Sequence, residues 1–470
     1  MNDLNNDTPR DFKELLKEEF GVDNIPSKSD PVVEAENNNT TSNLLGELNY
    51  PEWKTVIEKN FPSLLLSAEV GLSLFGQLLI EDIVNPCAIV LVDVPSSGKT
   101  ISLNMFSELS RCYTTDNFTP SAFVSQAANV KKDQLKEVDL LPRIKDKVLM
   151  VRDLAPLFGQ RDDDLLRSLG VLTRVMDGEG LQLDAGVHGR RGYVGEYNFM
   201  LLAASTPIPP KIFKLMGNLG SRLFFLSIHS KRKNEEDLVE QLINHSWKDK
   251  QKECSLATRK LVETLFKKYE IKAVWNKEKD SKDIIRIIAR AAVLLSSLRG
   301  SINVWKENSA DGVEYSYPEP IIEMPDRITQ ILYNVARGHA IASGRLELNN
   351  EDIKLILNIA FDSAPSSRTK IFRLLLIHDG FLTTQNVVDG LNCSDTTANK
   401  EMEILKILGI ATIGSESSSG AGRPQKAISL CKEFEWFKSE ECLSLIGIKK
   451  EEKKDEIDSD IEDILGGESL

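Results

Sequence analysis

Cysteine is scarce in this sequence, and none of it stands at the spacing of a metal site. The six residues are Cys87, Cys112, Cys254, Cys393, Cys431 and Cys442. No C-x-x-C pair occurs, and no histidine lies at ligand spacing from any of them. The pattern therefore indicates neither a zinc site nor a disulfide framework.

Long apolar runs are also missing. The nearest approach to a membrane span, residues 62–80, is interrupted by Ser67, Glu69, Gly71, Ser73 and Gln77. No apolar core of signal-peptide type follows Met1. We therefore expect a cytoplasmic protein that makes no contact with a membrane.

Basic charge is in deficit, with 58 Lys and Arg against 71 Asp and Glu and a net charge of −13. The deficit lies at the ends, because residues 1–50 and residues 440–470 each hold 11 acidic and 4 basic side chains. The chain between them is close to neutral. Local basic patches can therefore still contact nucleic acid.

Both ends of the chain have the composition of disordered segments. Residues 1–45 are rich in Asn, Asp, Ser and Glu and poor in aromatics, so they cannot bury enough surface to become ordered. Residues 438–470 form a similar acidic tail, which ends in the acidic and apolar stretch Asp458–Leu465. This stretch either aids solubility or binds a protein partner.

The 470 residues exceed the roughly 250 to 300 at which one hydrophobic core stops growing, so several domains are expected. Strand-like and helical patterns alternate over residues 46–232, which predicts an α/β domain with a parallel sheet. Residues 233–365 read as helices, with a loop expected at Asp311–Pro320. Residues 366–437 read as three helices followed by a glycine-rich hairpin.

A phosphate-binding loop follows the apolar run Ala88–Val94. The residues Pro95, Ser96, Ser97, Gly98, Lys99 and Thr100 lead directly into a helical pattern that starts at Ile101. In such a loop, backbone N–H groups surround the phosphates, the lysine reaches the β and γ oxygens and the threonine hydroxyl binds Mg²⁺. The usual first glycine is replaced by Asp93. We expect ATP and Mg²⁺ to bind here.

A second apolar run, Lys147–Asp153, ends in a carboxylate about fifty residues further on. Asp153 is therefore the predicted acid on the metal side of the site. The second acid that usually follows is missing, because Leu154 stands there. Three carboxylates at Asp162–Asp164 could supply a base, but three adjacent acids more often begin a solvated helix.

A third run, Asn198–Ala204, ends in Ser205 and Thr206. A polar residue at the tip of this strand can orient water against the γ-phosphate, and Thr206 is the predicted one. Arg222 stands just before the next apolar run and could stabilise the phosphate of a neighbouring subunit during transfer. An arginine in this position is otherwise a surface salt-bridge former.

The order of these parts, over about residues 60–365, resembles the ATPase core of the minichromosome maintenance helicases. Residues 62–76 resemble that family's entry helix, and residues 181–207 resemble its pre-sensor hairpin and sensor strand. Ser221 and Arg222 match the family's Ser-Arg finger. The resemblance implies an AAA+ fold, with residues 233–365 as its helical lid and the sensor-2 arginine at Arg327. The Thr206 position is an asparagine in the family, and no N-terminal zinc and oligonucleotide-binding collar is present.

The predicted hairpin carries basic residues at its turn. Alternating residues over Leu181–Val187 indicate one strand, and Tyr193–Tyr197 is expected to return. The tip then holds His188, Arg190 and Arg191, which suit phosphate contact. The alternative is a surface hairpin with a solvated basic turn.

The C-terminal pattern, with helices predicted at Ser366–His378, Thr383–Leu391 and Asp395–Leu408, resembles a winged helix-turn-helix. The third helix faces the core through Ala398, Met402, Leu405 and Leu408, and outward through Thr396, Asn399, Lys400 and Glu403. Arg423 and Lys426 lie on the wing. Such domains bind DNA or serve only as protein contacts.

Together these features predict an ATP-driven DNA translocase or helicase that acts as a ring hexamer in DNA replication. Single-stranded DNA would occupy the channel, and duplex DNA would contact the winged helix. The rival is a DNA-binding initiator in which ATP switches assembly with little hydrolysis. A third, weaker alternative is a remodelling ATPase whose winged helix binds protein.

Overall fold

A computed structural model describes residues 47–125, 134–185, 189–220, 222–229, 233–243, 246–309, 312–416 and 425–448. All of these residues belong to one compact unit. The predicted disordered segment 1–45 and the stretch Asp458–Leu465 lie outside the described residues. None of the helices described is long and apolar enough to cross a membrane.

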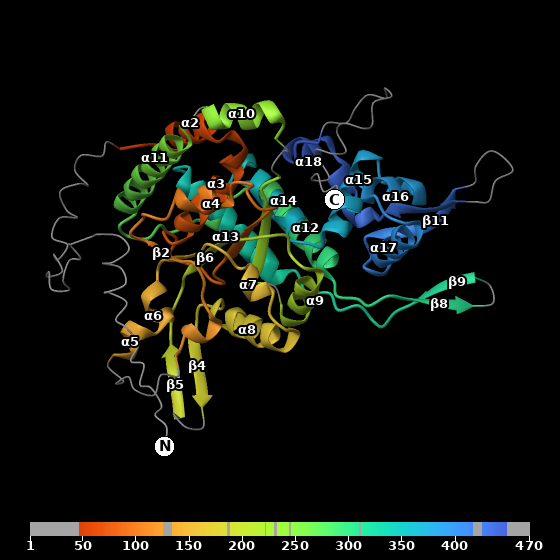
Figure 1. The fold of residues 1–470 in the computed structure, drawn as a ribbon, viewed down its shortest axis with the longest axis horizontal. Coiled ribbons are helices and arrows are strands. Elements are labelled where there is room, and N and C mark those ends of the chain that lie inside the picture. Colours follow the sequence, from red (N-terminus) through yellow and green to blue (C-terminus); the bar gives the residue numbers. More distant parts are fainter. Residues whose placement is uncertain are drawn as a thin grey trace, which may run out of the picture. The chain divides into compact units, whose positions relative to one another are not determined.

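The centre of the N-terminal half is a five-stranded parallel sheet (Figure 1). Its order is β2 (Cys112–Thr115), β3 (Val148–Val151), β6 (Met200–Ser205), β1 (Ala88–Val92) and β7 (Leu223–Ser227). Every residue of β1, β3 and β6 is buried. This is the pattern of parallel strands that are covered on both faces, and it confirms the predicted α/β class.

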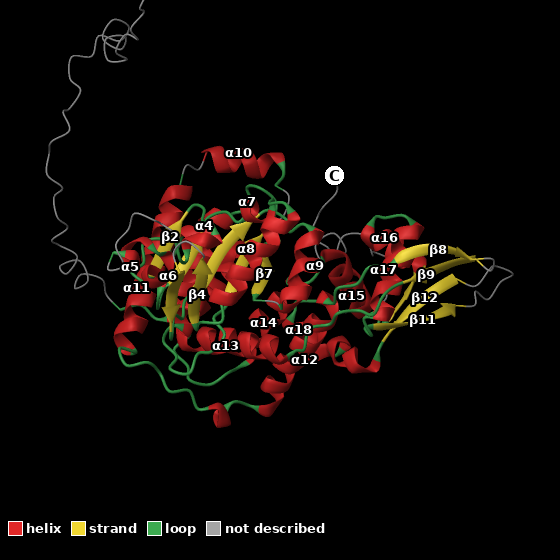
Figure 2. Ribbon diagram, turned by 90° about the horizontal axis from the view of Figure 1, so that it is seen from below, coloured by secondary structure: helices red, strands yellow, loops and turns green. Residues whose placement is uncertain are grey.

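Side chains of β1 alternate between two hydrophobic clusters, one on each face of the sheet. Ile89 and Leu91 join residues of α3 (Leu65–Gln77), while Ala88 and Val90 join residues of α8 (Asp162–Val175). The remaining elements of this region are α2 (Tyr50–Asn60), η2 (Pro62–Leu64), α4 (Lys99–Asn104), η3 (Pro120–Ala122), α5 (Leu135–Val138), α6 (Leu140–Ile144), α7 (Ala155–Phe158) and α9 (Pro210–Leu219). Figure 2 shows helices on both faces of the sheet.

A hairpin of β4 (Gly180–Ala185) and β5 (Gly189–Val194) projects away from the sheet (Figure 1). The return strand therefore begins earlier than the predicted Tyr193. Gly192 makes this possible, because its φ is +122° and a Cβ there would lie 2.0 Å from the carbonyl oxygen of Leu181.

Residues 233–365 are mainly helical. The helices are α10 (Glu235–Ile243), α11 (Trp247–Lys268), η4 (Lys277–Lys279), α12 (Lys282–Arg299), α13 (Asp326–Ala342) and α14 (Asn350–Asp362). Where a loop was predicted at Asp311–Pro320, the chain instead forms an antiparallel hairpin of β8 (Trp305–Ser309) and β9 (Gly312–Ser316). Asp311 itself lies outside the described residues. The prediction missed this hairpin because its strands are polar and lack a clear apolar alternation.

The C-terminal module has three helices and a three-stranded antiparallel sheet. Its elements are α15 (Ser366–Ile377), β10 (Phe381–Thr383), α16 (Thr384–Leu391), α17 (Asp395–Ile407), β11 (Ala411–Glu416) and β12 (Gln425–Leu430), with sheet order β10-β12-β11. Thr383 and Ser394 cap α16 and α17 through their side chains. The three predicted helices are therefore present with nearly the predicted bounds.

The described chain continues past this module, which corrects the predicted start of the disordered tail at residue 438. The segments η5 (Lys432–Lys438) and α18 (Glu440–Leu445) follow β12. Phe434 and Phe437 are buried against Phe372, and Phe437 also meets Phe361 of α14. Cys442 and Leu443 of α18 are buried as well, so the ordered chain extends past residue 438 in spite of its acidic composition.

Candidate functional site

The predicted phosphate-binding loop connects β1 to α4. Two of its residues have a left-handed backbone, Ser96 with φ of +68° and Gly98 with φ of +100°. A Cβ on Gly98 would lie 3.1 Å from the Leu64 side chain, so glycine is required both by the dihedral and by the neighbour. The loop is therefore held in a tight turn at the carboxyl end of β1, directly before the N-terminus of a helix.

The Lys99 ammonium lies over its own loop. Its Nζ donates to the carbonyl oxygens of Asp93 and Val94, each at 2.6 Å, and to Ser97 Oγ at 3.2 Å. Burial lowers the pKa of Lys99, and the negative charges of Asp93 and Asp153 partly oppose this. The structure thus brings Lys99 within the electrostatic reach of both carboxylates.

Strand β6 lies between β1 and β3 and aligns their ends. The Asp93 N–H donates to the Ser205 carbonyl oxygen at 3.5 Å, and the Leu154 N–H donates to that of Ala204 at 2.8 Å. The loop residue Asp93 and the strand-end residue Asp153 therefore flank the tip of β6. Predicted site residues that are more than fifty positions apart in the sequence meet at one edge of the sheet.

Asp153 is exposed at this edge. Its Oδ1 accepts a hydrogen bond from the Ala155 N–H at 2.9 Å, which fixes the carboxylate at the start of α7. Leu154, which occupies the usual position of a second acid, is only 1% exposed. Asp162–Asp164 occupy the first turn of α8 and are exposed there, and Asp162 pairs with Lys211 at 3.3 Å. The second reading of these acids, as a solvated helix start, fits their position.

The two polar residues at the end of β6 differ in exposure. Ser205 ends the strand and is 2% exposed, whereas Thr206 follows it and is exposed. Thr206 is therefore accessible to a ligand at this position and Ser205 is not, while the role of Thr206 in orienting water stays a prediction.

Only two of the predicted site residues, Thr100 and Asp153, could bind a Mg²⁺ ion. Thr100 is exposed at the start of α4, and Asp153 is exposed at the end of β3. The described residues contain no group of three or more His, Cys, Asp or Glu side chains that could hold a metal alone. These residues therefore fit Mg²⁺ only as a shared ion, with the other ligands supplied by phosphate oxygens and water.

Arg222 lies at the opposite edge of the sheet, where the parallel strands begin rather than end. It precedes β7, whose first residue Leu223 pairs with Ala88 at the start of β1, whereas the loop follows the last residue of β1. At about 3.3 Å per residue, roughly 16 Å separates Arg222 from the loop of the same chain. Arg222 therefore cannot reach a phosphate that would bind at Lys99 of the same chain.

Arg222 is 7% exposed, and its guanidinium pairs with Asp177. Its Nη2 and Nε donate to Asp177 Oδ1 at 2.7 and 3.1 Å, and its Nη1 donates to the Gly220 carbonyl oxygen at 3.3 Å. The sequence prediction missed Asp177, because nothing in the local pattern at the end of α8 distinguishes this acid from others. Ser221 lies outside the described residues.

Arg327, predicted from the resemblance alone, lies close to Arg222. A Cβ on Gly220 would lie 3.0 Å from Arg222 Nη1 and 3.6 Å from Arg327 Nη1. Because Gly220 has no side chain, the guanidiniums of Arg222 and Arg327 can both lie beside its Cα. Glu323 is the acidic neighbour there, 3.6 Å from the same position.

The hairpin arginines are on the return strand rather than on the tip, which corrects their predicted place. Arg190 pairs in register with Asp184, and Arg191 pairs with Leu183. Successive strand residues point to opposite faces, so the two arginines do not form one patch. Arg190 is exposed and donates to the Gln182 side chain. His188 lies outside the described residues.

The predicted DNA-contacting residues of α17 are partly exposed. Thr396 and Lys400 are exposed, and Asn399 is half-buried, with its amide donating to the Asp395 carbonyl oxygen at 2.8 Å. Glu403 is 7% exposed, which corrects its predicted outward orientation.

Glu403 is buried because two lysines pair with its carboxylate. Lys406 donates to its Oε1 at 2.7 Å, and Lys426 donates to its Oε2 at 3.1 Å. Lys426 also lies 5.6 Å from the centre of the Tyr315 ring on β9. Lys426, a predicted DNA contact, is thus engaged by Glu403 and Tyr315 of its own chain. Arg423 lies outside the described residues.

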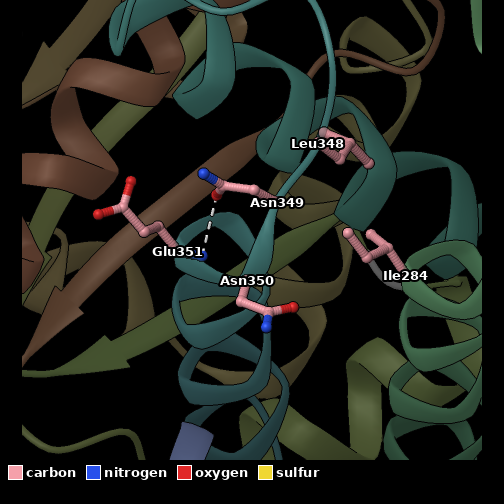
Figure 3. A pocket seen from close by; sticks show the side chains of 5 residues that line it. All are labelled: Ile284, Leu348, Asn349, Asn350 and Glu351. Atoms are coloured by element: carbon pink, nitrogen blue, oxygen red, sulfur yellow. Dashed lines mark hydrogen bonds between the residues drawn. The ribbon is translucent and has the colours of Figure 1, made fainter. Parts of the chain in front are cut away.

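A hollow of about 350 Å³ lies elsewhere, at the start of α14 (Figure 3). Its lining is Ile284, Leu348, Asn349, Asn350 and Glu351. The Asn349 side chain accepts a hydrogen bond from the Glu351 N–H at 3.0 Å, as part of a helix cap. None of the predicted site residues lines this hollow, so it is a feature of helix capping rather than of the nucleotide site.

Neither a scan against protein-family models nor a search of curated proteins found a match to this chain.

Proposed function

We propose that this protein is an ATPase of the AAA+ kind that binds Mg²⁺-ATP at residues 95–100, and that its sites are completed by a second copy. The observation that carries the proposal is the position of the site residues at two edges of one sheet. Lys99, Asp153 and Thr206 are at the carboxyl edge, and Arg222 is at the amino edge. Two copies that meet edge to edge would join both sets.

In this proposal, each group has a physical task. The loop N–H groups and Lys99 bind phosphate oxygens, which replace the carbonyl contacts that Lys99 makes now. Thr100 and Asp153 hold the Mg²⁺ water shell, and Thr206 orients water toward the γ-phosphate. Arg222 and Arg327 stabilise the charge that develops on the phosphate of the adjacent copy. When bound, Mg²⁺ supplies Lewis-acid stabilisation of that charge.

We further propose a winged helix-turn-helix over residues 366–437 that contacts duplex DNA through Thr396, Asn399 and Lys400. The element order of three helices and a wing-like hairpin supports this, as does the exposure of Lys400. A ring hexamer in the cytoplasm that translocates single-stranded DNA past the β4–β5 hairpin would combine these parts.

The switch-type initiator is the second candidate. Leu154 at the usual place of the second acid favours it, because a buried aliphatic side chain cannot activate the attacking water. In that case ATP would bind and change the assembly without rapid hydrolysis.

Steady-state ATPase measured with and without single-stranded DNA separates the two. The motor predicts stimulation by DNA, and an Arg190→Ala/Arg191→Ala variant should lose this stimulation while it still binds duplex. The matched control is Lys400→Ala/Arg423→Ala, which should weaken duplex binding and reduce the salt dependence of log K by about 0.9 per lost phosphate contact. If the hairpin variant keeps full DNA-stimulated turnover, the motor proposal is wrong and the switch becomes the better account.

A further inference from the structure

The most tightly held arginine of the proposed shared site has an acidic partner in its own subunit. Asp177 follows the C-terminal end of α8 and accepts from Arg222 through Oδ1 alone, at 2.7 and 3.1 Å. Its Oδ2 accepts from Arg174 Nη1 at 3.2 Å, and Arg174 also pairs with Glu179 at 3.1 Å. One carboxylate therefore joins two arginines, one exposed and one buried.

This pairing restricts which part of Arg222 can meet a ligand. Two of its nitrogens, Nε and Nη2, are engaged by Asp177. Nη1 lies along Gly220, the residue beside which the Arg327 guanidinium also lies. The planar guanidinium cannot rotate without breaking its bonds to Asp177, so its orientation is fixed.

We propose that Asp177 is a positioning residue, which holds Arg222 beside Arg327 so that the two cations form one phosphate-binding pair for the adjacent copy. This rests on the proposed function, and it adds a residue that acts through Arg222 without touching nucleotide. The carboxylate also offsets part of the repulsion between the two guanidiniums, which allows them to remain close before a phosphate arrives.

The experiment uses full-length subunits mixed in pairs, with ATPase as the readout. A Lys99→Ala subunit has no working loop but keeps its arginines, and an Arg222→Ala subunit has the reverse defect. Mixed together, they should regain turnover at interfaces where the intact loop meets the intact arginine. This first mixture tests the shared site itself, and failure there would overturn the proposed function together with the inference.

Asp177→Ala should behave as an arginine-side defect. Alone, it should lower kcat by about 10- to 100-fold, the usual effect of removing a group that orients a catalytic one, with KM for ATP nearly unchanged. Mixed with Lys99→Ala it should regain activity, and mixed with Arg222→Ala it should not. Asp177→Glu should restore part of the rate, and Asp177→Asn, which keeps the acceptor oxygen, covers the case in which Asp177→Ala does not fold.

Glu179→Ala is the matched control, because it removes the other partner of Arg174 and leaves Arg222 untouched. It should keep kcat within about twofold of wild type, as expected for an exposed ion pair. If Asp177 variants instead complement Arg222→Ala, or if they fail to complement Lys99→Ala while Arg222→Ala succeeds, then Asp177 does not act through Arg222 and the inference is wrong.

Discussion

Gly76 on α3 and Gly338 on α13 touch backbone to backbone. A Cβ on Gly76 would lie 2.0 Å from the Gly338 carbonyl oxygen, and a Cβ on Gly338 would lie 2.2 Å from that of Ser73. This contact joins the helix that precedes the phosphate loop to the helix that carries Arg327. The helix before β1 is therefore held against the helix that carries Arg327 by one close backbone crossing.

Gly338→Ala should separate these helices and lower the free energy of unfolding by roughly 3 kcal/mol, the upper range for overpacking a core. Gly170→Ala is the control, because Gly170 is within α8 and nothing lies within 4 Å of a Cβ there. That variant should be neutral or slightly more stable, since alanine favours helices by up to about 1 kcal/mol. Denaturant unfolding of both variants measures the difference, and equal stability would show that the crossing can relax.

Asp153→Asn should keep nucleotide binding but reduce turnover by about 100-fold, the scale of losing one group that stabilises a transition state. The carboxylate orders the metal ion, whereas phosphate capture depends on Lys99 and the loop amides. The control Asp162→Asn removes an exposed acid at the start of α8 and should leave turnover unchanged. The reverse result, a normal Asp153→Asn and a slow Asp162→Asn, would move the metal-side acid to α8.

Much of the fold could be predicted because its signals are local. Val90, Leu149 and Leu201 lie in continuous apolar runs that become buried parallel strands, and Gly98 and Lys99 mark the turn by their residue types. The contacts that arise only from tertiary packing could not be predicted. Asp177 is one acid among 71 acidic residues until folding brings it to Arg222. Glu403 occupies a polar helical position, and one of the two lysines that pair with it, Lys426, arrives from a distant strand.

Arg222→Ala and Arg327→Ala should each lower the turnover of mixed oligomers in proportion to the fraction of variant subunits, because each missing arginine disables one neighbour's site and leaves the other sites intact. Turnover by the homogeneous Arg222→Ala oligomer should fall by about 10³-fold or more. A titration of either variant into wild-type protein, followed by ATPase, gives the dependence on the fraction of variant. A loss much steeper than proportional would mean that one defective site stops the others, and mixing Lys99→Ala with Arg222→Ala would then not restore turnover.

The Glu403 cluster makes a prediction about pH. Burial raises the pKa of Glu403, but hydrogen bonds and charge from Lys406 and Lys426 outweigh this and hold it below its usual 4.5. A lowered carboxyl pKa contributes stability that is present above 4.5 and is lost as the pH falls through the folded-state value. The difference in Tm between wild type and Glu403→Gln should therefore be largest near neutral pH and should shrink below about pH 4.5. A difference that stays constant with pH would mean that the cluster adds no charge-dependent stability.

The most direct test of the account is equilibrium binding of Mg²⁺-ATP to wild-type protein and to Lys99→Ala. Both the motor and the switch require binding at residues 95–100, so the test does not depend on the rate of hydrolysis. Lys211→Ala is the control, since this partly exposed lysine also donates to a backbone carbonyl, that of Gln160 at 2.8 Å. We expect Lys99→Ala to weaken binding at least about tenfold, through loss of a charge-assisted contact to phosphate, and Lys211→Ala to bind normally. Wild-type protein that does not bind Mg²⁺-ATP, or Lys99→Ala protein that binds it as tightly as wild type, would contradict the account.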